Sequence, residues 1–73
     1  MKWFLVLLFW NPEVQDFQVA DGWAPLPQPT YERCAERLAF THRYLPDAAE
    51  GYSYLVDCIW TTSQDEAIKK LKE

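Results

Sequence analysis

Eight consecutive apolar residues, Trp3 to Trp10, follow directly after Met1 and Lys2. Both alternating sets of side chains in this run are apolar, which is typical of a strand that is buried on both faces. We therefore expect residues 3–10 to form the central strand of a sheet, with other elements covering both faces.

The same run also has the outline of a secretory signal segment, because one positive charge precedes the apolar stretch. Asn11 and Pro12 end the stretch abruptly, and no clear pair of small residues follows for cleavage. The run is also far shorter than the roughly 20 residues that cross a bilayer. A strand is the favoured interpretation, and a signal segment is the alternative.

A second strand and an extended connector are predicted next. Apolar and polar residues alternate over residues 14–20, so that Phe17 and Val19 share one face. The turn signal Asn11-Pro12 places this strand in a hairpin with the first. Residues 23–29 carry a proline at every second position, and proline neither donates to a strand ladder nor fits inside a helix. We expect an extended connector there.

One long amphipathic helix is predicted from Tyr31 to about Leu45, with Thr30 as its N-cap. Pro46 and Gly51 mark its end. At about 100° per residue, one stripe of side chains is expected to face the core, and it consists of Tyr31, Cys34, Ala35, Leu38, His42 and Leu45.

Two further elements complete the pattern. Residues 52–60 are rich in strand formers and predict a third strand. Ser63 and Glu66 have the spacing of a capping box, which predicts a short terminal helix. Its apolar face consists of Ala67, Ile68 and Leu71, and its last turn carries Lys69, Lys70 and Lys72, cations that suit the C-terminal end of a helix.

These elements predict an α+β fold of the order ββαβα in a single domain, residues 1–73. A right-handed crossover through the long helix places the third strand on the free edge of the first. The resulting three-stranded sheet has the order 2-1-3, a split βαβ unit that is half of a ferredoxin-like fold. The long helix covers one face, and whether the short helix covers the other is left open. If it does not, a homodimer is the simplest cover for an exposed apolar face.

Composition and charge limit the classes of function. The 73 residues are 49% hydrophobic and 25% charged, with 2 glycines, which excludes a disordered tail and a disulfide-dense mini-protein. Eleven acidic against seven basic residues give a net charge of −4, so a basic face for duplex nucleic acid is not expected. We expect a small acidic protein that takes no cofactor and binds neither duplex nucleic acid nor a membrane.

Three residues could carry chemistry, namely Cys34 and His42 in the long helix and Cys58 in the third strand. The two cysteines could meet across the helix–sheet interface, and buried free thiols are the favoured interpretation. A disulfide would need an oxidising compartment, and zinc would lack the paired cysteine spacing and a fourth ligand. No catalytic motif occurs, so we expect no enzyme. A thiol- or metal-dependent protein built on these three residues is the alternative.

A candidate binding surface lies on the side of the long helix opposite its core stripe. Arg33, Arg37, Phe40 and Tyr44 project within about 60° of one another, and arginine and aromatic residues are enriched in protein interfaces. We predict that these four residues bind a partner, with Trp23 beside them. In the alternative interpretation the connector folds over Phe40 and the arginines pair with glutamates of the same helix.

A resemblance adds context to this prediction. Asp21-Gly22-Trp23, Pro25 and Gln28-Pro29 are followed by Cys34, Arg37 and Phe40 and by Tyr44-Leu45. In this pattern the chain resembles small uncharacterised proteins of tailed bacteriophages, particularly marine ones, over residues 1–60. The resemblance assigns no activity to any residue. It implies a phage product in the bacterial cytoplasm, where thiols stay reduced.

Small acidic phage proteins often bind and modulate a host protein. We therefore expect a non-enzymatic protein-interaction module, homodimeric, in the host cytoplasm. An exported, envelope-associated small protein is a further alternative.

Overall fold

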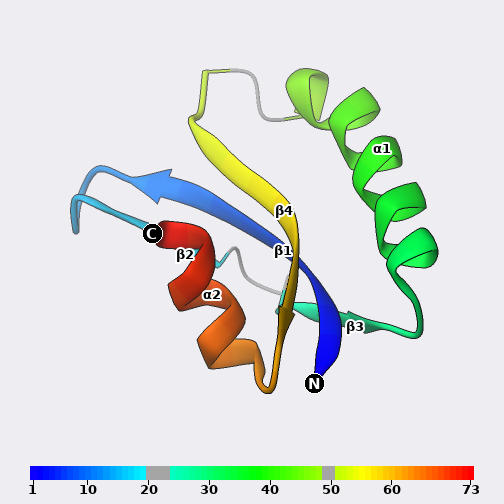
Figure 1. Ribbon diagram of the computed structural model, residues 1–73. Coiled ribbons are helices and arrows are strands. Elements are labelled where there is room, and N and C mark those ends of the chain that lie inside the picture. The colour runs from blue at the N-terminus through cyan, green and yellow to red at the C-terminus, as the bar shows by residue number, and fades with distance from the viewer. Residues whose placement is uncertain (20–23, 49–50) are drawn as a thin grey trace.

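A computed structural model describes residues 1–19, 24–48 and 51–73 (Figure 1). Along the chain the elements are β1 (Lys2–Asn11), β2 (Asp16–Val19), β3 (Leu26–Gln28), α1 (Tyr31–Ala48), β4 (Tyr54–Thr61) and α2 (Gln64–Lys72). The predicted α+β fold and its element order are confirmed, with one additional short strand.

β1 is the central strand and pairs antiparallel with all three others. Leu8 and Phe9 pair with β2 and with β4 at the same time, so these two strands lie on opposite edges of β1. Because both are antiparallel to β1, β2 and β4 run parallel to each other. This is the predicted split βαβ unit, with the apolar N-terminal run as its middle strand.

The additional strand, β3, forms within the proline-rich segment where the sequence predicted only a connector. It lies on the same edge of β1 as β2, where Leu26 pairs with Leu5 and Pro27 with Phe4. A proline is tolerated in an edge strand where its nitrogen is not required as a donor to the neighbouring strand. The prolines therefore limit this strand to three residues rather than preventing it.

The even-numbered side chains of β1 form the main core under α2. Val6, Leu8 and Ala67 are all 0% exposed, and Figure 1 shows α1 and α2 on opposite sides of the strands. Partly buried side chains surround them, namely Phe17, Val19, Leu55, Ile59, Ile68 and Leu71. The terminal helix therefore covers this face, and a face-to-face homodimer is not needed to bury it.

Local signals position α2 over this core. The predicted N-cap Ser63 has extended backbone, and its hydroxyl accepts a hydrogen bond from the N–H of Glu66 at 3.2 Å. Near the end of the helix, the ammonium of Lys72 donates to the carboxylate of Asp16 at 2.9 Å. This ion pair links the last turn of α2 to the start of β2.

The odd-numbered side chains of β1 face α1. Leu7 is buried against Leu45, with Phe9, Tyr54 and Val56 beside them. Cys34 and Cys58 form a disulfide whose Cα atoms are 6.1 Å apart, within the usual range. The expectation of two free thiols is therefore wrong, because the helix and β4 bring the two sulfur atoms into bonding contact.

α1 begins as predicted, since the Thr30 hydroxyl accepts from the N–H of Arg33 at 3.2 Å. The side of the helix that faces the sheet differs from the predicted stripe. Cys34 and Leu45 are buried, whereas His42 is exposed. The disulfide and the Leu45 contact set the rotation of the helix about its axis, and this rotation turns His42 out of the predicted core.

The helix also continues past Pro46 to Ala48. A proline inside a helix removes one N–H donor and crowds the preceding turn. Pro46 lies in the last turn of α1, and only two helical residues follow it. The predicted end near Leu45 is therefore early by less than one turn.

The Asp16–Lys72 pair predicts a pH effect. The hydrogen bond from Lys72, together with that from the N–H of Phe17, holds the pKa of Asp16 below its ordinary value. A carboxyl whose pKa is lowered by folding stabilises the protein above its unfolded pKa of about 3.9, and this contribution is lost as pH falls through the folded value. We expect Lys72→Ala to raise the pKa of Asp16 toward the ordinary value, measured by NMR titration of the Asp16 carboxyl carbon.

Lys69→Ala is the matched control for this titration, because Lys69 lies on the same helix and is exposed. It should leave the pKa of Asp16 unchanged. An Asp16 titration that is the same in the Lys72→Ala variant and the unsubstituted protein would show that the ion pair does not form in solution.

Candidate functional site

An apolar groove of about 230 Å³ lies between α1 and the sheet. Its floor consists of Leu5 and Leu7 of β1 and Leu26 of β3, and its helical wall consists of Arg37, Phe40, Thr41, Tyr44 and Leu45. We call this the α1 groove. α1 contacts the sheet closely at Cys34 and again at Leu45. Between these two contacts, the small side chain of Thr41 lines the groove.

Two aromatic side chains border the α1 groove on its helical side. Phe40 and Tyr44 are one helical turn apart, and their ring centroids lie 4.4 Å from each other. Phe40 is 62% exposed and Tyr44 is 53% exposed. Their mutual contact holds both rings in place while leaving most of their surface accessible. Large exposed aromatic pairs of this kind are typical of association surfaces.

The two arginines of the predicted surface have different surroundings. Arg33 pairs with Glu36 at 3.4 Å, and both side chains are largely exposed, so this pair contributes little to stability. Arg37 lines the α1 groove and forms no ion pair within the described residues. Its guanidinium is therefore available to an external carboxylate beside an apolar groove.

The structure thus brings together three of the predicted contact residues, Arg37, Phe40 and Tyr44. Arg33 does not line the α1 groove, and Trp23 lies outside the described residues. The predicted position of the surface is wrong in one respect, because these side chains do not lie opposite the sheet but border it along one flank of the helix. The rotation of α1 that exposes His42 is the cause.

Sequence reasoning missed the sheet half of the α1 groove. Leu5 and Leu7 were assigned to a covered face, which is correct for most of that face. Leu26 lies in the proline-rich segment, where no periodic pattern predicted pairing with β1. The register of β3 against β1 has no signal in the sequence that would have placed this side chain beside Leu5.

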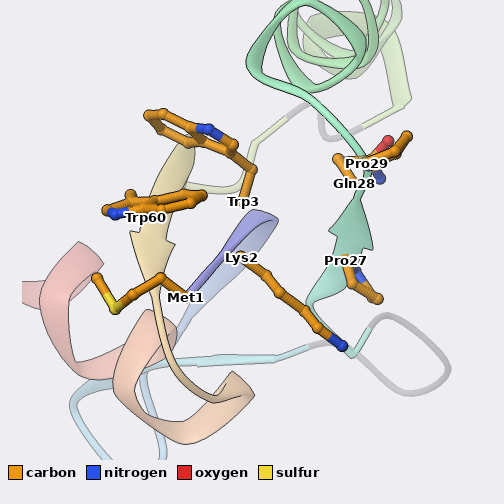
Figure 2. Close-up of a pocket in the computed structure, with 7 residues that line it drawn as sticks. All are labelled: Met1, Lys2, Trp3, Pro27, Gln28, Pro29 and Trp60. Atoms are coloured by element: carbon orange, nitrogen blue, oxygen red, sulfur yellow. The ribbon is translucent and has the colours of Figure 1, made fainter.

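A second hollow of about 380 Å³ lies at the other end of β3 (Figure 2). Its lining residues are Met1, Lys2, Trp3, Pro27, Gln28, Pro29 and Trp60. Figure 2 shows the indoles of Trp3 and Trp60 on one side and the β3 residues on the other. The ring centroids of these tryptophans are 5.3 Å apart. β3 therefore contributes to both hollows, since Leu26 lines the first and Pro27 and Gln28 line the second.

The residues of the alternative, thiol- or metal-dependent interpretation do not form a site. Cys34 and Cys58 are joined to each other and offer no thiolate. His42 is exposed on α1. Within residues 1–19, 24–48 and 51–73, no group of three or more histidine, cysteine or acidic side chains could hold a metal ion. In the same residues no helix is long and apolar enough to cross a membrane.

Comparison with protein-family models, with curated proteins and with solved structures found no match to this chain.

Proposed function

We propose that this protein is a small non-enzymatic interaction module that binds a segment of another protein in the α1 groove. The observation that carries the proposal is the exposed, contacting pair of Phe40 and Tyr44 beside an apolar groove that Arg37 also lines. Among the described residues, Arg37 forms no ion pair. Aromatic and arginine side chains that border a desolvated pocket commonly contribute most of the binding energy of a protein interface.

The size of the α1 groove supports a polypeptide ligand. Its volume of about 230 Å³ is below the range of roughly 300–1,000 Å³ that is usual for drug-sized ligands and cofactors. A space of this size suits one or a few apolar side chains of a partner. Since Arg37 borders the groove, a carboxylate next to those apolar residues would complete the interaction through charge-assisted hydrogen bonds.

The resemblance to tailed-bacteriophage proteins supports a host protein as the partner. The resemblance concerns the class of source, and the α1 groove adds the chemistry of the bound segment. The lining of the α1 groove supports a bound segment that is apolar with an adjacent acidic group.

Substitutions in the α1 groove should separate binding from folding. A peptide display library selected on the immobilised full chain should yield sequences in which an apolar residue stands next to Asp or Glu. We expect Phe40→Ala and Arg37→Ala each to weaken the selected peptide at least about tenfold, which corresponds to about 1.4 kcal/mol. Because the Phe40 side chain is mostly exposed, the thermal unfolding midpoint of the Phe40→Ala variant should stay within a few degrees of that of the unsubstituted protein.

His42→Ala and Arg43→Ala are matched controls, because both residues are exposed on the same helix and line no part of the α1 groove. Both should bind the peptide as the unsubstituted protein does. Selected peptides that bind equally to the Phe40→Ala and His42→Ala variants would contradict the proposal. Global unfolding of the Phe40→Ala variant would show instead that this side chain is structural.

We propose the bacterial cytoplasm as the compartment, on the basis of the resemblance. The Cys34–Cys58 disulfide favours the alternative of an exported, envelope-associated protein, because disulfides persist mainly in oxidising compartments. The compartment and the state of the cysteines are separate properties, and each can be measured directly.

Fractionation of bacteria that produce the full chain, combined with thiol alkylation before lysis, tests the compartment. The proposal predicts protein in the cytoplasmic fraction that retains residues 1–10 by mass spectrometry. Alkylation of both cysteines in that fraction would show that the disulfide is reduced there. A periplasmic product that has lost the first ten residues would instead establish the exported alternative and would remove most of β1.

A further inference from the structure

The outer edge of β4 carries backbone groups that no other strand of the described chain satisfies. β4 pairs with β1 along eight residues, and the opposite edge of β4 has no neighbour in the sheet. An edge of this length presents N–H and C=O groups in a row, and such a row is a template for another strand. The chemistry that this surface fits is therefore an extended backbone.

The direction of these groups follows from one hydrogen bond near the start of β4. The N–H of Trp10 donates to the carbonyl of Ser53 at 2.9 Å, so Ser53 turns its backbone groups toward β1. In an antiparallel strand, alternate residues turn theirs to opposite edges. The residues whose backbone N–H and C=O groups point away from β1 are consequently Tyr54, Val56, Cys58 and Trp60.

Side chains of the same chain occupy the C-terminal half of this edge. The carboxylate of Asp57 accepts from the N–H of Cys58 at 2.8 Å. The ammonium of Lys70 donates to the carbonyl of Trp60 at 3.3 Å. Both bonds compete with pairing to a further strand. Considering only the described residues, the part of the edge with both donor and acceptor free is therefore the short segment around Tyr54 and Val56.

We propose that this segment binds a second copy of the chain, with the two β4 strands antiparallel about a two-fold axis at Leu55. In this register Tyr54 of each copy faces Val56 of the other. Each of these two residue pairs can exchange two N–H···O bonds. The inference does not depend on the proposed function of the α1 groove.

The backbone groups of β4 that are already hydrogen-bonded favour this register over pairings centred on the next residues. Pairing centred on Val56 would bring Tyr54 opposite Cys58, whose N–H is already bonded to Asp57. Pairing centred on Asp57 would add two carboxylates directly opposite each other, which is destabilising. Centred on Leu55, the pairing sets Asp57 opposite Ser53 and one leucine opposite the other. The open segment is therefore complementary to itself, which favours a second copy over an unrelated strand.

Sedimentation and amide exchange of the full chain test this inference together. We expect a monomer–dimer equilibrium by analytical ultracentrifugation. The amides of Tyr54 and Val56 should exchange more slowly as protein concentration rises, whereas the amide of Cys58, already bonded within its own chain, should not change. Val56→Pro removes an outward donor but no bond to β1, and it should abolish the dimer while the NMR spectrum stays that of a folded protein.

Asp57→Ala is the opposing control, because it frees the N–H of Cys58 and should leave the dimer intact or strengthen it. A chain that is monomeric at all concentrations, with rapid exchange at Tyr54 and Val56, would overturn the inference. A dimer that forms without slower exchange of these amides would place the contact elsewhere and would also overturn the inference. A dimer that is lost in the Phe40→Ala variant would do the same. If Val56→Pro unfolds the chain, the concentration dependence of amide exchange at Tyr54 and Val56 in the unsubstituted protein tests the inference instead.

Discussion

The architecture depends on one strand that is apolar on both faces. β1 can be stable only if its even-numbered and odd-numbered side chains are both removed from water, which requires a layer on each side of the sheet. α2 supplies one layer and α1 the other (Figure 1). The burial of Val6 and Leu8 to 0% exposure and the pairing of β1 with every other strand both follow from this central position.

The two layers are unequal, and the inequality creates the candidate site. α2 is short but packs directly onto the core through Ala67, whose small side chain allows close approach. α1 is longer, yet its close contacts with the sheet are concentrated at Cys34 near its start and Leu45 near its end. The space between these contacts is the α1 groove, and the rotation of the helix places Phe40 along it. A disulfide across an otherwise partial interface thus both anchors the helix and preserves an opening.

The sequence predicted the features that depend on local chemistry. The doubly apolar strand and the caps at Thr30 and Ser63 follow from residue patterns within short segments, and the split βαβ order follows from the general handedness of crossover connections. The exposure of His42 and the position of Leu26 were missed, because they depend on the rotation of α1 and on strand register. The meeting of Cys34 and Cys58 across the helix–sheet interface was anticipated, but free thiols were favoured over the disulfide because a disulfide needs an oxidising compartment. The candidate site was accordingly predicted in its helical half, Arg37, Phe40 and Tyr44, and missed in its sheet half.

Amide hydrogen exchange of the full chain, with the disulfide intact and after its reduction, tests most directly whether β1 and not the disulfide sustains the fold. The amides of Val6 and Leu8 should be among the slowest to exchange in both states, because the core under α2 does not include the cysteines. Reduction should accelerate exchange mainly in the first half of α1, around Cys34. Equally fast exchange throughout β1 and α2 after reduction would contradict this account and would show that the Cys34–Cys58 bond holds the whole domain together.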